Sequence, residues 1–421
     1  MHLNELKRKS TQELAELADR LGVEGAASLR RQDLVFGILK NQGDRKGDIL
    51  ADGVIEVLPD GFGFLRAPDQ NYQPGADDIY VSPSQIRRFS LRTGDTVAGQ
   101  IRPPKESERY FALLRVDGVN GESPDARRGK ALFDNLTPIY PDRRLRVAHD
   151  RADVGARLVD LFAPLGFGQR CLMIAPPRAG ATQLLEELAR GIAANHPDAA
   201  LTVLLCDERP EDVTAMRRAT PAEVASSTFD EPPARHVQVA ELVIEKAKRV
   251  AEAGKDAIVL VDSLTRLAAA YGAALTPSGR SGAGGLDQAA VHRIKRFLGA
   301  ARSIEEGGSL TIVAVAQVAA GAHLDELVAE ELRATATSEI HLDRRLAEQR
   351  RYPTIDVVAS STRRDELLTT AAERDAAAAL RTELGALDPV EALERVLAEL
   401  ARFDDNAALV ARRAGPVAAQ R

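Results

Sequence analysis

The feature that most constrains this chain is an alternation of apolar runs and helical stretches after residue 151. The runs typical of strands cover residues 171–175, 201–206, 223–227, 257–262, 309–316 and 338–342. Such alternation is typical of an α/β domain with a largely parallel sheet. Residues 370–384 and 389–402 are expected to form closing helices. The sequence therefore predicts an α/β domain over residues 151–421.

Three of these runs end in groups that suit a nucleotide. The segment GQRCLMIAPPRAGAT (168–182) has the order strand, small-residue loop, helix start, which presents backbone N–H groups to phosphate. Glu208 follows one run and Asp262 ends another. Because carboxyl ends of parallel strands meet at one sheet edge, these carboxylates could hold Mg²⁺ and activate water there. Each acid alone could equally be a solvated loop charge.

The phosphate loop itself is a weak match. Against G-x-x-x-x-G-K-[ST], only Gly180 and Thr182 agree, Ala175 stands at the first glycine, and Ala181 stands at the lysine that contacts phosphate. Taken alone, the loop could be an ordinary α/β turn.

Two smaller domains are expected before the α/β domain. Residues 1–47 have helical spacing, with a capping box at Ser10 and Glu13. Residues 48–117 change to a period of two, which predicts a small barrel. Its five strands are expected at 54–58, 62–66, 79–81, 96–101 and 111–116. Residues 118–150 are rich in Gly and Pro and are interpreted as a connector.

Phe62 and Phe64 in DGFGFLR lie two residues apart, so both point to one face of their strand. Glycines 61 and 63 are expected to leave the other face open, and Tyr80 supplies a third ring. Residues 82–116 carry seven Lys and Arg against three Asp and Glu. Rings and cations together favour single-stranded nucleic acid. The alternative, that both phenylalanines belong to the barrel core, stays open from the pattern alone.

Other kinds of site are disfavoured. The two cysteines, Cys171 and Cys206, lie in apolar runs, and the seven histidines show no metal-binding spacing. No apolar run approaches the ~18 residues of a membrane span. With a net charge of −6, nucleic-acid contact requires a local basic patch. We therefore expect a cytoplasmic protein with no membrane partner.

Long motifs in a fixed order resemble the bacterial transcription termination factor Rho family over essentially the whole chain. They include DGFGFLR, DDIYVSPSQIRRF, IRPPKESERYFALL, DERPEDVT, RHVQVAE, VDSLTRLA, EEGGSLTI and STRRDELLTT. The resemblance implies a multidomain chain: an N-terminal helical domain, an RNA-binding barrel of the oligonucleotide-binding (OB) or cold-shock type and a RecA-type P-loop ATPase. It also implies an RNA-dependent ATPase and helicase that uses ATP with Mg²⁺ in a hexameric ring. RNA polymerase is a further partner that the resemblance allows, and no DNA partner is expected.

The resemblance also implies roles for individual residues. Thr182 and Asp262 would hold the metal, Glu208 would activate water, and Arg363 would be an arginine finger offered to a neighbouring subunit. The nucleotide-binding residues would be Gly168, Gln169, Arg170, Arg178, Ala179, Gly180, Ala181, Thr182, Gln183 and Arg209. The RNA-binding residues would be Gly61, Phe62, Gly63, Phe64, Leu65, Arg66, Asp78, Ile79, Tyr80, Glu108, Arg109, Tyr110 and the pore-loop residue His323.

The departures from the family pattern leave two hypotheses. The loop reads PPRAGAT where the family has PPKAGKT, so Arg178 keeps a cation while Ala181 removes one, and His323 stands at a lysine position. The first hypothesis is a termination factor that translocates on nascent RNA and releases transcripts. The second is an RNA-binding ring subunit with weak or lost hydrolysis, in a homohexamer or in a mixed ring beside an active Rho. The two differ in whether Arg178 replaces the missing lysine.

Overall fold

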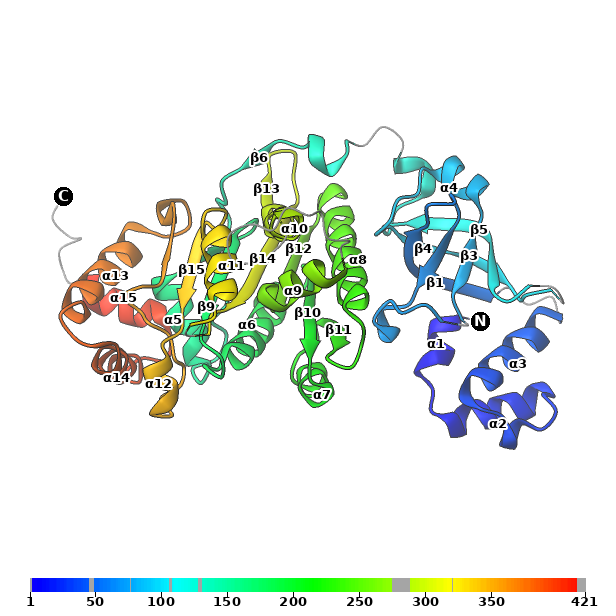
Figure 1. Cartoon of the computed structure of the whole chain (residues 1–421), viewed down its shortest axis with the longest axis horizontal. Coiled ribbons are helices and arrows are strands. Elements are labelled where there is room, and N and C mark those ends of the chain that lie inside the picture. Colours follow the sequence, from blue (N-terminus) through cyan, green and yellow to red (C-terminus); the bar gives the residue numbers. More distant parts are fainter. Residues whose placement is uncertain are drawn as a thin grey trace. The chain divides into compact units, whose positions relative to one another are not determined.

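The computed structural model describes residues 2–44, 49–75, 77–105, 108–127, 131–274, 288–319 and 321–414. The chain forms two compact units, Met1–Ala131 and Leu132–Arg421 (Figure 1). No helix among the described residues combines the length and the apolar character that crossing a membrane requires.

The first unit begins with a small helical part. Its elements are α1 (Leu3–Arg8), α2 (Thr11–Leu21), the 3₁₀ turn η1 (Ala26–Ser28) and α3 (Arg31–Asp44). The predicted capping box at the start of α2 is confirmed. The Glu13 amide donates to Ser10 Oγ at 3.2 Å, and the Ser10 amide donates to Glu13 Oε2 at 2.7 Å.

A closed five-stranded barrel follows, with strand order β1-β2-β3-β5-β4. The strands are β1 (Ile49–Val57), β2 (Gly63–Arg66), β3 (Ile79–Val81), β4 (Thr96–Arg102) and β5 (Phe111–Val119). The five predicted strands are thus present, and β5 continues three residues further than expected. Helix α4 (Pro83–Phe89) begins after the cap Ser82, and η2 (Pro68–Gln70) and η3 (Pro124–Arg127) are short turns. The core is formed by inward-facing aliphatic residues such as Ile55, Val81 and Val97.

The second unit is built on a sheet whose central strands are parallel, in the order β11-β10-β12-β14-β9-β15, with β16 antiparallel at the edge. The six predicted strands are all present: β9 (Arg170–Ala175), β10 (Ala200–Glu208), β11 (Glu223–Thr228), β12 (Asp256–Asp262), β14 (Ser309–Gln317) and β15 (Ser338–His341). Five short strands were not predicted: β6 (Pro138–Ile139), β7 (Arg144–Leu145), β8 (Leu165–Gly166), β13 (Arg302–Ile304) and β16 (Ser361–Thr362).

Helices connect these strands and close the unit. They are α5 (Val154–Phe162), α6 (Ala181–Asn195), α7 (Pro210–Ala219), α8 (Pro233–Glu252), α9 (Leu264–Ala274), α10 (Gln288–Gly299), α11 (His323–Arg333) and α12 (Arg344–Glu348). The turns η4 (Phe133–Asn135) and η5 (Asp365–Leu367) are 3₁₀. The two predicted closing helices are α13 (Ala371–Leu384) and α14 (Pro389–Leu400), and the unpredicted α15 (Asn406–Ala414) packs with them.

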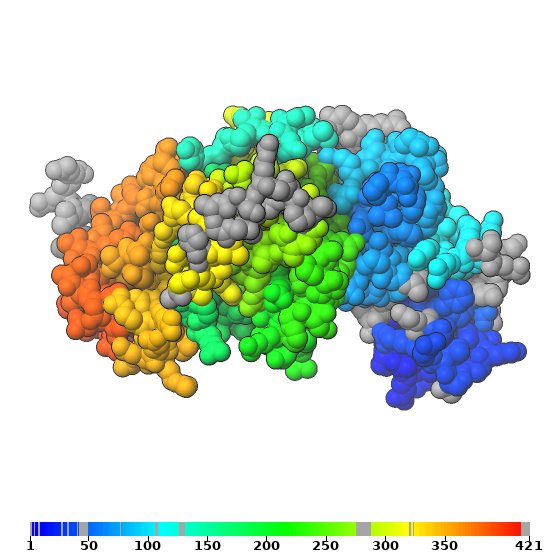
Figure 2. Space-filling view, in the orientation of Figure 1, coloured from blue at the N-terminus to red at the C-terminus, as the bar shows by residue number. Residues whose placement is uncertain are grey.

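Parallel pairing gives this sheet two distinct edges. We call the edge where β9, β10 and β12 end the carboxyl edge, and the edge where β9 and β15 begin the amino edge. Helices α13, α14 and α15 lie together at one end of the unit, where Figure 2 shows their surface in orange and red. The sheet therefore brings the loop after β9 together with the last residues of β10 and β12.

Candidate functional site

Four aromatic rings gather on the outside of the barrel. The ring of Phe64 lies 5.8 Å from that of Phe62, 6.1 Å from that of Tyr80 and 4.8 Å from that of Tyr110, measured between centroids. All four rings are half-buried, and none belongs to the buried core of the unit. The structure therefore places Phe62 and Phe64 outside the core. The expectation that Gly63 leaves an open face is wrong, because a Cβ there would lie 2.8 Å from the Glu56 carbonyl oxygen.

Two charged residues of the predicted RNA surface lie beneath these rings rather than on the surface. The side chain of Arg66 is only 6% exposed and forms ion pairs with Glu56 and with the buried Asp78. Burial is the largest influence on Asp78 and raises the pKa of its carboxyl, against the opposing effect of the Gly75 amide and Arg66. The Arg66 guanidinium lies 5.1 Å from the Phe64 ring centroid. These two residues therefore support the ring-bearing strands, and neighbouring Leu65 and Ile79 are core residues.

A groove of about 590 Å³ runs beside the rings. It is lined by Tyr80, Ser82, Ser84, Gln85, Arg102, Glu108, Arg109, Tyr110, Ala112, Leu113 and Leu114. Arg109 is exposed, and Arg102 Nη2 donates to Glu108 Oε1 at 2.8 Å. That hydrogen bond lowers the pKa of Glu108 to about 2. Ser82, Ser84 and Gln85 join this groove because α4 is held beside β5, which pattern reasoning did not reveal.

At the carboxyl edge of the other unit, the loop after β9 borders a cavity of about 430 Å³. Its lining includes five predicted nucleotide-binding residues, Arg178, Ala179, Gly180, Ala181 and Thr182, together with the predicted Gln183. Gly180 caps α6 with φ of 82°, a left-handed conformation that favours glycine, and the Leu184 amide donates to its carbonyl at 3.0 Å. The first amides of α6 thus face the place where phosphate would bind.

The hydroxyl of Thr182 connects this loop to the carboxylate at the end of β12. Thr182 Oγ1 donates to Asp262 Oδ2 at 2.7 Å. Asp262 is completely buried, and its other oxygen, Oδ1, has no hydrogen-bond partner in the described structure. Burial raises the pKa of this carboxyl, although the Thr182 hydroxyl opposes the shift. A hydroxyl and a buried carboxylate with a free oxygen are ligands that suit Mg²⁺.

Glu208, at the end of β10, is held by Arg266 of α9. The two side chains form an ion pair, and Arg266 Nη1 also donates to the Asp207 carbonyl at 2.9 Å. Burial raises the pKa of Glu208 and is the largest influence, while Arg266 lowers it. The residues that line the cavity do not include Glu208, Asp262 or Arg209. Thr182 connects Asp262 to the cavity through its hydrogen bond, and Arg209 is exposed at the start of α7. The described residues contain no cluster of three or more His, Cys, Asp or Glu that could enclose a metal.

Three residues assigned to the nucleotide site lie elsewhere. Gly168, Gln169 and Arg170 stand at the amino edge, and Arg170 is five strand residues from Ala175, about 17 Å at ~3.3 Å per residue. Gln169 is buried and donates to Thr337 Oγ1 at 2.8 Å. Within one subunit, strand β9 separates these three residues from the phosphate loop that follows it, and their assignment to the nucleotide site stays a prediction. Arg363 lies at the same amino edge: its amide donates to the Thr337 carbonyl at 2.8 Å.

Two further residues concern the cavity and the pore loop. Tyr352 lines the cavity, is half exposed, and its ring carbon lies 3.0 Å from the place where a Cβ on Gly180 would be. Aromatic residues make up only 4% of the chain, and this scarcity was the sequence signal that could have singled out Tyr352. The pore-loop residue His323 is the first residue of α11, and its side chain lies outside the described residues.

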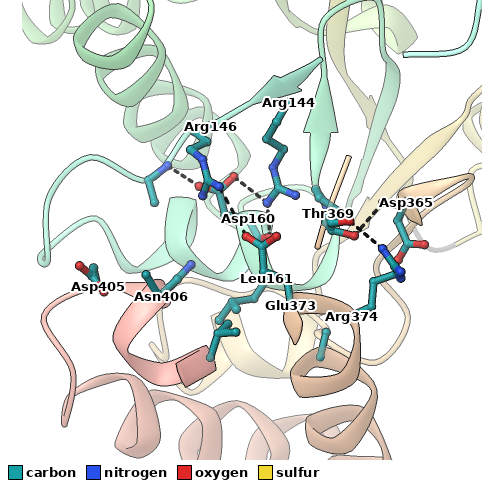
Figure 3. A pocket seen from close by; sticks show the side chains of 15 residues that line it. Arg144, Arg146, Asp160, Leu161, Asp365, Thr369, Glu373, Arg374, Asp405 and Asn406 are labelled. Carbon is teal, nitrogen blue, oxygen red and sulfur yellow. Dashed lines mark hydrogen bonds and ion pairs between the residues drawn. The ribbon is translucent and has the colours of Figure 1, made fainter. Parts of the chain in front are cut away.

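A second cavity in this unit, of about 220 Å³, lies where α5, α13 and α15 meet (Figure 3). Several charged groups that line this cavity form hydrogen bonds or ion pairs within the same unit. Arg144 Nη2 donates to the Asp160 carbonyl at 2.6 Å, and the carboxylate of Asp160 accepts from the amides of Val147 and Ala148 at 3.2 and 2.9 Å. Arg146 faces Glu373 at 3.6 Å. These contacts join the segment after β7 to α5 and, through Glu373, to the closing helix α13.

Comparison with known proteins agrees with the domain order. Residues 5–47 match the family described as "Rho termination factor, N-terminal domain", and residues 51–125 match "Rho termination factor, RNA-binding domain". Residues 155–362 match "ATP synthase alpha/beta family, nucleotide-binding domain". Among solved structures, the ATPase EscN of a type III secretion system gives a TM-score of 0.54 at 19% identity, over 82% of this chain and 83% of that chain. That likeness shows the RecA-type fold.

Curated relatives match along nearly their whole length. The chain is 52% identical to transcription termination factor Rho of Escherichia coli (strain K12) over 409 residues, which cover 96% of this chain and 98% of the relative. It is 53% identical to the factor of the same name from Haemophilus influenzae over 410 residues, with the same coverage of both chains. With these domains in this order and this degree of identity, the chain belongs to the transcription termination factor Rho family.

Proposed function

We propose that this chain is a Rho-type termination factor that binds single-stranded RNA on its barrel and uses ATP with Mg²⁺ to move along that RNA. The observation that carries the proposal is the contact between Thr182 and the buried Asp262 beside the phosphate loop, with Glu208 at the same sheet edge. This is the arrangement that phosphoryl transfer to water requires: a loop, a metal-binding pair and a carboxylate near the attacking water.

The cavity suits a nucleoside triphosphate. The backbone of residues 178–182 would cradle the β- and γ-phosphates, and the exposed ring of Tyr352 would stack on the base. Thr182 and Asp262 would hold Mg²⁺, which supplies charge neutralisation at the phosphate oxygens. The unpartnered Oδ1 of Asp262 supports this fit.

Hydrolysis then needs a base. The oxygen of a water molecule bonds to the γ-phosphorus as the bond to the bridging oxygen breaks, which yields ADP and phosphate. Glu208 would orient this water and accept its proton. The ion pair with Arg266 fixes the carboxylate and favours its charged form. Burial disfavours the charged form, so the basicity of Glu208 depends on both burial and the ion pair with Arg266.

The loop of this chain lacks one charge that such a site uses. Ala181 offers no cation, and Arg178 is exposed in the same cavity with a left-handed φ of 64°. A guanidinium three residues earlier does not reproduce an ammonium inside the loop. Loss of one preorganised electrostatic donor typically lowers a rate by ~10²–10³. We therefore propose that ATP binds and that turnover is slow.

RNA binding would use the exposed faces of the four rings and the cations of the groove. Stacking contributes about 1–3 kcal/mol per base. Arg363 would act on the nucleotide of an adjacent subunit in a hexameric ring, because the amino edge is a strand length from this chain's own loop. Action on nascent RNA beside RNA polymerase would place the protein in the cytoplasm.

Transcript release tests this proposal. Polymerase stalled on a template with a pyrimidine-rich transcript is incubated with the Ala181→Lys protein, and released RNA is counted with ATP and with a non-hydrolysable analogue. We expect release with ATP alone, and loss of release when Glu208→Gln is added. A protein that binds the RNA but releases no transcript with ATP would contradict the proposed function.

A further inference from the structure

Asp212 is an acidic residue of the cavity beside the phosphate loop, and its charge is not matched inside the protein. It lies in the first turn of α7 and lines the cavity together with Thr182. Its side chain is half-buried, and its carboxylate makes no hydrogen bond or ion pair within the described part of the chain. Glu186 lines the same cavity, but Arg190 Nη1 donates to Glu186 Oε1 at 2.6 Å. Asp212 therefore brings an uncompensated negative charge to the cavity.

This charge acts on the carboxylate that is expected to hold Mg²⁺. Burial is the largest cause of the raised pKa of Asp262, and the negative charge of Asp212 adds to it. Thr182, which lines the cavity with Asp212, donates to Asp262 Oδ2, while Asp262 Oδ1 is buried without a hydrogen-bond partner. Two carboxylates that repel one another beside a cavity favour positive charge between or near them.

The same cavity is short of positive charge. Ala181 stands where the loop pattern has a lysine, so Arg178 is the one cation among the described residues that line the cavity. Asp212 opposes that cation, and a bound triphosphate adds several more negative charges. A single Mg²⁺ at Thr182 and Asp262 leaves much of this charge unmatched. Some phosphoryl-transfer sites solve the same problem with two Mg²⁺ that bridge the β- and γ-phosphates.

We propose that this nucleotide site binds a second divalent cation, held by Asp212 and by phosphate oxygens of the nucleotide. The cation supplies beside the phosphates the positive charge that the loop lacks at Ala181. Mg²⁺ suits this place because one or two carboxylates hold it when phosphates and water complete its octahedron. Such a cation does not need three protein ligands in one cluster, which the described residues do not offer.

The inference rests on the proposed function, since it takes the cavity to be the site of ATP, and it adds the metal content of that site. Equilibrium dialysis tests it without relying on turnover, by counting the Mn²⁺ and the non-hydrolysable ATP analogue that the protein retains. Mn²⁺ is the probe because it takes the same octahedral oxygen ligands as Mg²⁺. The wild-type chain should retain about two Mn²⁺ per analogue, as two-metal sites do.

Asp212→Asn keeps the shape of the side chain and removes its charge. This variant should retain about one Mn²⁺ per analogue and should bind the analogue at least about 10-fold more weakly, the effect of losing one charge-assisted contact. Glu211→Gln is the matched control, because it removes a charge from the same turn, and Glu211 is exposed and does not line the cavity. The control should retain the metal and the affinity of the wild type.

A second comparison asks whether the cation replaces the lysine. The Ala181→Lys protein should retain about one Mn²⁺ per analogue, and adding Asp212→Asn to it should change analogue affinity by less than about 2-fold, because the two changes act on one charge. One Mn²⁺ per analogue in the wild type, or an equal loss of affinity from Asp212→Asn with and without the lysine, would overturn the inference. Failure of the proposed function is distinguishable, because then no protein of the series would retain the analogue.

Discussion

The rings of Phe62, Phe64, Tyr80 and Tyr110 form one surface on the outside of the barrel. The spacing of Phe62 and Phe64 placed both rings on one face, and the structure packs Tyr110, which only the family resemblance had assigned to RNA, against Phe64. The pattern could not show that Arg66 would be buried by ion pairs with Glu56 and Asp78, because those contacts depend on how three strands close the barrel.

The rings give the first prediction. Phe62→Ala with Phe64→Ala should weaken binding of single-stranded RNA by at least about 2 kcal/mol, because two stacking faces are lost. Fluorescence titration measures the affinity and thermal melting monitors the fold. Phe229→Ala removes an exposed ring from the other unit and serves as control. Unchanged affinity in the double variant, or loss of folding, would contradict the assignment.

Glu208 leads to a prediction for the pH dependence of ATP turnover. Burial raises the pKa of this carboxyl, and its charged form is the base, so turnover of the Ala181→Lys protein should fall as pH falls through that raised pKa. Arg266 lowers the pKa, so Arg266→Gln should move this acid limb to higher pH. Initial rates across a pH series give the midpoint. A limb that stays in place or moves to lower pH would count against Glu208 as the base.

Elements were predicted well where they are long and periodic. The six strands of the sheet and both closing helices were found from apolar periodicity, because each buries one or two faces in the core. The short strands β6, β13 and β16 were missed, since two or three residues carry no period and pair only through tertiary contacts. The predicted strand at 171–175 already put Gly168, Gln169 and Arg170 at its start, and the sheet pairing adds that this start lies at the amino edge.

Helix α6 gives a prediction at this scale. A Cβ on Gly191 would lie 1.8 Å from the Val147 carbonyl oxygen, and backbone cannot move aside cheaply. Gly191→Ala should therefore lower the free energy of unfolding by about 3 kcal/mol or more. Gly299→Ala, at the end of α10, meets its nearest neighbour at 3.8 Å and should change little. Denaturant unfolding of the two variants compares them, and equal midpoints would contradict the packing argument.

The whole molecule combines segments that carry the family pattern with an altered phosphate loop. Its 52% identity to a curated relative extends over 96% of the chain, so Ala181 stands in a chain that carries the family pattern along nearly all of its given length. The two hypotheses raised by the sequence differ in how fast the chain itself turns over ATP. Arg178 is exposed and lines the cavity, so the turnover of the wild-type chain decides between them.

The most direct test is the rate of ATP hydrolysis by the wild-type protein and the Ala181→Lys variant, each with and without a pyrimidine-rich RNA. If the rest of the site is intact, the lysine should raise RNA-stimulated turnover at least about 100-fold. Wild-type turnover of ~1 s⁻¹ or more, within the usual range of enzymes, would contradict this account and indicate that Arg178 replaces the lysine.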